Sequence, residues 1–120
     1  MKYSIFIGFF ILVSCARVIE EKTLIEMFNS KDKRQLLTAI DYVSDHHEVH
    51  MVKYLLSDAL DPRIVHDIRH KGMSIYQIKM GAMQKLTGVK SFKKITYRPD
   101  SSVVNFYLEI SVNNGWINSP

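Results

Sequence analysis

Apolar residues recur at helical spacing along most of the chain, and short polar stretches separate these segments. A first short helix is expected to end near Phe28. The next helix begins after Asp32, a capping residue, and buries one face over three turns: Leu36, Leu37, Ile40 and Val43. A polar turn at residues 44–47 precedes a second helix, which is expected to be antiparallel because the turn is short. Its apolar positions are Val49, Val52, Leu55, Leu56 and Ala59.

The second half of the chain predicts three more helices. Asp61 and Pro62 indicate the start of a short third helix, which turns Ile64, Val65 and Ile68 inward and ends at Gly72. Ser74 and Gln77 form a capping box for a fourth helix that ends at Gly88, with these inward positions: Ile75, Ile78, Ala82, Met83 and Leu86. A looser stretch at 89–98 leads to a last helix at about 102–112, which turns Val103, Phe106, Tyr107 and Ile110 inward. Trp116 and Ile117 are expected to fold back over it as a lid. The pattern predicts one compact all-α domain of about five or six short helices.

The first fifteen residues have a different pattern, typical of a secretory signal. Lys2 precedes an apolar core at 5–13, and small and aliphatic residues lead to Cys15. Nine apolar residues are too few to span a membrane, which takes roughly 20. We therefore expect this segment to be removed.

The last four residues of this segment, Leu12, Val13, Ser14 and Cys15, resemble the lipobox of bacterial lipoproteins. The resemblance implies cleavage after Ser14, a diacylglycerol thioether on Cys15, and acylation of its new amino group by a fatty acid such as palmitate. Several acyl chains give stable anchoring, whereas one chain is marginal. An Asp directly after the lipidated cysteine would resemble an inner-membrane retention signal of Gram-negative bacteria. This chain has Ala16 at that position, which favours an anchor in the outer membrane with the protein facing the periplasm. The alternatives are an ordinary signal peptide cut nearby and a cytosolic protein with a buried N-terminal strand.

The expected organisation has three parts. Residues 1–14 are the lipoprotein signal peptide, 15–31 hold the lipidated cysteine, a tether and the first short helix, and 32–120 form the helical domain with its C-terminal cap.

An internal echo links two of the predicted helices. Four apolar positions of the helix that begins after Asp32 recur 43 residues later in the helix that begins after Ser74. Leu37, Ala39, Ile40 and Val43 align with Met80, Ala82, Met83 and Leu86. Together with Asp61-Pro62 between the helix pairs, this spacing resembles HEAT repeats, which implies stacked antiparallel helix pairs. The stretch 66–74 departs from a standard repeat turn because it is basic and broken by glycine. An unrelated helical bundle is the alternative.

Composition adds few signs of chemistry. The 120 residues include one cysteine, so no intrachain disulfide can form. Histidines gather in two places, His46, His47 and His50 around a turn, and His66 and His70 on one face of the predicted third helix. Neither group has the glutamate of a zinc-hydrolase motif, so no metal or other cofactor is expected. The chain has no nucleophile elbow and no glycine-rich phosphate loop, and Asp58, Asp61 and Asp67 are explained as helix caps or solvated charges. We therefore predict a protein that is not an enzyme.

One charged segment stands above the mild net charge of +4. It contains five cations and two aromatic residues, Phe92 and Tyr97, with no acidic residue before Asp100. The cations are Lys85, Lys90, Lys93, Lys94 and Arg98. Such a segment can bind an acidic protein surface, anionic lipid headgroups or lipopolysaccharide phosphates, and a solvated loop is the alternative. Nucleic acid is not expected as a partner of an exported protein.

These observations predict a lipid-anchored, non-enzymatic adaptor that binds an envelope protein through its helical surface. Two functions fit this description equally well. One is an assembly factor similar to the pilotin lipoproteins of secretion channels, and the other is an immunity or inhibitor lipoprotein against an envelope-acting toxin. The third alternative is an enzyme or metal carrier that uses the histidines.

Overall fold

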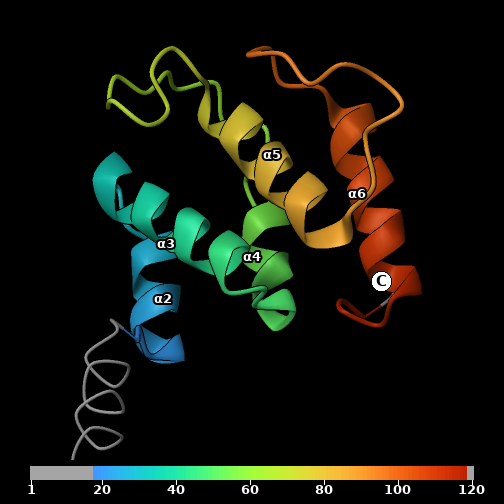
Figure 1. The fold of residues 1–120 in the computed structure, drawn as a ribbon, viewed down its shortest axis with the longest axis horizontal. Helices are drawn as coiled ribbons and strands as arrows, with labels where there is room; N and C mark the ends of the chain where they lie inside the picture. Colours follow the sequence, from blue (N-terminus) through green and yellow to red (C-terminus); the bar gives the residue numbers. More distant parts are fainter. Residues whose placement is uncertain (1–17, 119–120) are drawn as a thin grey trace, which may run out of the picture.

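The computed structural model describes residues 18–118, which form five α-helices and one short 3-10 helix (Figure 1). In chain order these are α2 (Glu21–Phe28), α3 (Lys33–Asp45), η1 (Val49–Met51), α4 (Val52–Leu56), α5 (Ile75–Thr87) and α6 (Ser101–Asn113). Within 18–118 the sole β pairing is an isolated antiparallel bridge between Ile64 and Ser74. The all-α prediction is confirmed for this part of the chain.

Two of the polar residues that the sequence assigns to helix starts, Asp32 and Ser74, do cap them. The Asp32 carboxylate accepts a hydrogen bond from the Arg34 amide at 2.9 Å, and Ser74 Oγ accepts one from the Gln77 amide at 3.1 Å. Gly88 ends α5 with a φ of 69°, a left-handed conformation that costs glycine little. Local hydrogen bonding thus fixes where α3 and α5 begin and where α5 ends.

The prediction of a third helix after Asp61 is wrong, because residues 57–74 form a loop. The Asp61 carboxylate accepts from both the backbone and the guanidinium of Arg63, so it closes a turn instead of capping a helix. The Val65 amide donates across the loop to the Met73 carbonyl at 2.8 Å, which removes a donor that a helix would use. Ile68, which was expected to be buried, is fully exposed. The preceding helix is also shorter than predicted, since α4 ends at Leu56.

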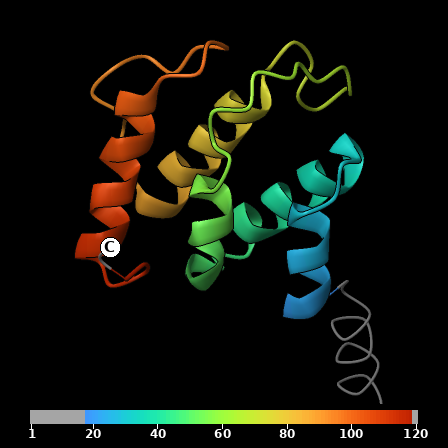
Figure 2. The same ribbon diagram turned by 180° about the vertical axis from the view of Figure 1, so that it is seen from behind.

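Helix α5 is the centre of the packing. It contacts α3, α4 and α6, while α3 also packs against α2. The expected partner of α3 was the next helix along the chain, but α4 packs mainly on α5 and α6. In Figures 1 and 2, α3 and α5 run in the same general direction. The two helices that share the sequence echo therefore lie side by side.

The core is apolar and draws on every helix. Its largest fully buried side chains are Ile40, Val43, Met51, Val52, Leu55, Ile75, Tyr76, Met80, Met83, Val103 and Tyr107. The hydroxyl of Tyr107 donates to the Val89 carbonyl at 2.9 Å, so its polar end is satisfied. Trp116 and Ile117 are half-buried against this core, which confirms the predicted C-terminal lid.

Two isoleucines that the sequence assigns to the core provide a matched test. Ile40 is 1% exposed and Ile68 is 101% exposed. Ile40→Asp should unfold the domain, because an unpaired buried carboxylate costs several kcal/mol. Ile68→Asp should change the unfolding free energy by less than about 0.5 kcal/mol. Urea unfolding followed by circular dichroism measures both, and equal effects of the two changes would contradict this core.

Candidate functional site

The predicted basic segment divides into paired and unpaired cations. Lys85 Nζ lies 2.7 Å from Asp45 Oδ1, although 40 residues separate them, and Lys93 Nζ lies 3.2 Å from Asp100 Oδ2. These contacts neutralise two of the five predicted cations. Lys85 therefore belongs to the contact between α3 and α5 and not to an open basic surface.

The remaining cations share a loop with exposed aromatic rings. Lys90 and Lys94 are exposed and form no ion pair with any other residue of 18–118. Phe92 and Tyr97 are 61% and 53% exposed, and Arg98 lies over the Tyr97 ring, 5.8 Å from its centroid. We call these five residues the basic–aromatic loop.

Ion pairs hold the other long loop, residues 57–74, against α3. His70 Nε2 lies 3.0 Å from Asp41 Oδ1, and Arg69 reaches Asp41 at 3.5 Å and Asp45 at 3.6 Å. The hydrogen bond from Lys85, with the nearby charge of Arg69, holds the pKa of Asp45 below its usual value. Figures 1 and 2 show this loop and the basic–aromatic loop at the same edge of the molecule.

The histidines do not converge. His66 and His70 do not share a helix face, because their segment is a loop in which His66 is exposed while His70 contacts Asp41. His46 stacks on Tyr42 with ring centroids 4.0 Å apart. Among the described residues, no three His, Cys, Asp or Glu side chains are grouped in a way that could hold a metal ion.

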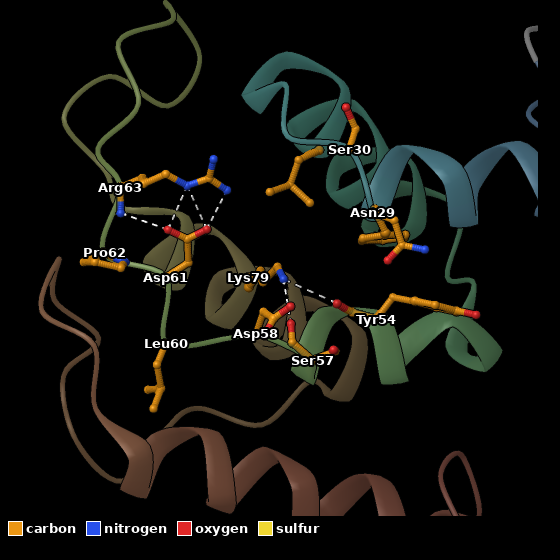
Figure 3. A pocket seen from close by; sticks show the side chains of 12 residues that line it. Asn29, Ser30, Tyr54, Ser57, Asp58, Leu60, Asp61, Pro62, Arg63 and Lys79 are labelled. Atoms are coloured by element: carbon orange, nitrogen blue, oxygen red, sulfur yellow. Dashed lines mark hydrogen bonds and ion pairs between the residues drawn. The ribbon is translucent and has the colours of Figure 1, made fainter.

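A cavity of about 520 Å³ lies where the end of α2 faces the end of α4 (Figure 3). Part of its wall is apolar, and the rest carries charged and hydroxyl groups. The lining residues are Phe28, Asn29, Ser30, Leu36, Tyr54, Ser57, Asp58, Leu60, Asp61, Pro62, Arg63 and Lys79. This volume falls in the range of small-ligand sites, roughly 300–1,000 Å³.

Lys79 reaches this cavity from α5 and is only 4% exposed. Its ammonium donates to the Ser57 carbonyl at 2.8 Å and to the Tyr54 carbonyl at 3.4 Å, which lie at the C-terminal end of α4. Burial lowers the pKa of Lys79, and the charges of Asp58 and Asp61 oppose that shift. Lys79 thus supplies the hydrogen bonds that the last carbonyls of α4 lack.

Lys79 is not among the site residues predicted from the sequence, although the pattern of α5 contains a signal for it. In α5 the apolar face recurs at positions 75, 78, 82, 83 and 86, and position 79 falls on that same face. A lysine on this apolar face must either be buried with hydrogen-bond partners for its ammonium or leave a gap in the buried face. Its partners lie 22 and 25 residues earlier, where no local rule identifies them.

Asp61 and Arg63 form a clamp at one side of the cavity. The guanidinium Nε lies 3.0 Å from both Asp61 oxygens, and Nη2 donates to Oδ2 at 2.7 Å. Burial alone would raise the pKa of Asp61, but the hydrogen bonds and charge of Arg63 outweigh it, so the pKa is lowered.

Other expectations lie outside this geometry. Cys15 and the predicted signal peptide fall in residues 1–17, beyond the described part of the chain. None of the described helices has the length and apolar character needed to cross a membrane. Comparison with protein-family models, curated proteins and solved structures finds no match to this chain.

The clamp predicts an acid-sensitive contribution to stability. Because the folded pKa of Asp61 is below its unfolded value of 3.8, its stabilisation is complete above that value and is lost as pH falls through the folded pKa. Asp61→Asn should lower the unfolding free energy by about 1 kcal/mol at pH 7, and this difference should shrink towards pH 2.

Urea unfolding of both proteins at pH 7 and pH 2 measures this change. The exposed carboxyl of Glu26 on α2 provides the control, since Glu26→Gln should leave stability unchanged at pH 7. A difference between wild type and Asp61→Asn that stays constant with pH would contradict the role of the Asp61 charge.

Proposed function

We propose that this chain is a lipid-anchored, non-enzymatic adaptor of the bacterial envelope that binds an acidic surface of a protein partner. The observation that carries this proposal is the basic–aromatic loop, where exposed aromatic rings lie among cations without carboxylate partners in 18–118. Aromatic residues and arginine are enriched where protein interfaces are strongest.

The loop is held by contacts with α6. Phe92 lies against Phe106 with ring centroids 5.6 Å apart, Val89 accepts from Tyr107, and Lys93 pairs with Asp100. A partly fixed loop loses less conformational entropy on binding than a free one. Lys90 and Lys94 remain available to attract an acidic partner and to steer its approach.

The position of this loop favours a protein partner over the headgroups of the anchoring membrane. Helix α2 begins at the end of the molecule opposite the edge that holds the basic–aromatic loop (Figures 1 and 2). A lipid anchor ahead of α2 would therefore hold the loop away from the membrane surface. A protein partner in the periplasm agrees with both proposed roles, an assembly factor similar to the pilotins and an immunity or inhibitor lipoprotein.

Reversal of the free loop charges tests partner binding. A photo-crosslinker at Phe92, in the bacterium that makes the protein, should capture one partner, identified by mass spectrometry. Lys90→Glu with Lys94→Glu should reduce that product at least about tenfold, because both attractive contacts become repulsive.

Lys22→Glu with Lys53→Glu is the matched control, since both lysines are exposed and lie away from the loop. The control should retain the product. Acidic residues of the captured partner, changed to lysine, should restore binding to the reversed loop. A product that survives the loop reversal would contradict this interface.

The proposed anchor has its own test. Cys15→Ser should abolish incorporation of labelled palmitate and release the protein from the membrane fraction, because the hydroxyl cannot replace the thiol in the thioether. Ser14→Ala keeps a small residue before the cysteine and should still be acylated. Palmitate labelling of Cys15→Ser at the wild-type level would overturn the anchor.

A further inference from the structure

The cavity around Lys79 takes no part in binding by the basic–aromatic loop, yet it has unused hydrogen-bonding groups. The Lys79 ammonium has three N–H groups, and two are accounted for by the carbonyls of Ser57 and Tyr54. Arg63 directs Nε and Nη2 at Asp61, while its Nη1 has only a long contact of 3.5 Å with the Lys31 carbonyl. Donors from two cations therefore remain free beside the cavity.

The acceptors of the cavity are distributed differently. Both oxygens of Asp61 are occupied by Arg63. Asp58 also lines the cavity, and its carboxylate has no hydrogen bond or ion pair with any residue in the described range 18–118. Figure 3 shows Asp58 beside Lys79 among the side chains that line the cavity. The site thus combines cationic donors with one free anionic acceptor.

An apolar wall completes the cavity. The rings of Phe28 and Tyr54 stack with centroids 5.6 Å apart, and Leu36 and Leu60 add aliphatic surface. A small apolar side chain can be buried against this wall while polar groups of the same ligand reach Lys79, Arg63 and Asp58.

We propose that this cavity binds the carboxyl terminus of a peptide chain whose last side chain is apolar. The terminal carboxylate accepts from Lys79 and Arg63, the last amide N–H donates to Asp58, and the side chain packs on Phe28 and Tyr54. A bare carboxylate lacks the N–H and is repelled by Asp58, so the free acceptor selects a peptide end. This site is independent of the basic–aromatic loop.

Titration of the isotope-labelled full chain in detergent, followed by NMR, tests the ligand class. The probe is acetyl-Ala-Leu with a free carboxylate, compared with the same peptide as its amide and with 4-methylpentanoate. The acid should shift the backbone amides of Asn29, Ser30 and Ser57 and bind at least about tenfold more tightly than either comparison compound.

Variants separate the groups that act on the ligand. Arg63→Gln, at a side chain that is 44% exposed, and Lys79→Met should each weaken binding of the acid about tenfold or more, whereas Lys22→Gln should not. If Lys79→Met fails to fold without its contacts to α4, Arg63→Gln still decides the result. Lys90→Glu with Lys94→Glu should leave peptide affinity unchanged, so failure of this site is distinguishable from failure of the loop.

Asp58 distinguishes a peptide end from a free small carboxylate. Its φ of 49° lies in the left-handed region that asparagine tolerates, so Asp58→Asn should preserve the fold. This change should weaken the peptide several-fold and strengthen 4-methylpentanoate. Equal binding of acid and amide would overturn the proposal. Binding of 4-methylpentanoate as tight as that of the peptide would also overturn it and would assign the cavity to small carboxylates.

Discussion

The contact between the Lys79 ammonium and the end of α4 holds together parts of the molecule that are far apart in sequence. Helix α4 has five residues, too few to persist without tertiary support. Its last carbonyls would remain unpaired in a partly buried place, and Lys79 of α5 supplies donors for them. Hydrogen bonds to the backbone carbonyls thus offset the free-energy cost of desolvating one ammonium. This balance holds only while both partners stay in place.

The same contact shapes the surface around it. Because α4 ends at Leu56, the chain is free to form the loop 57–74, which supplies Asp58, Asp61 and Arg63 to the cavity. The far part of this loop is fixed on α3 by His70 and Arg69. The loop 57–74 therefore lines the cavity and also reaches the edge of the molecule that holds the basic–aromatic loop. We assign the cavity and the basic–aromatic loop to different ligands.

Local signals in the sequence predicted the helix ends well, because a cap such as Ser74 bonds to a backbone group three residues away. The prediction of a third helix was wrong because Asp61 followed by proline is compatible with both a capped helix and a closed turn. The hydrogen bonds from Arg63 to Asp61 favour the turn. Lys79 and the pair of Lys85 with Asp45 depend on partners 22 to 40 residues away, which no local pattern identifies. The lipid anchor at Cys15 stays a prediction.

The shortness of α4 makes its end dependent on a side chain from another helix. The Lys79 ammonium of α5 contacts both the C-terminal end of α4 and the first residue of the loop 57–74, so loss of that contact acts on both segments at once. The α3–α5 contact does not depend on it, since Lys85 and Asp45 join these helices elsewhere. A change at Lys79 therefore reaches α4 and the start of the loop together, and the cavity lies where these two segments meet α5.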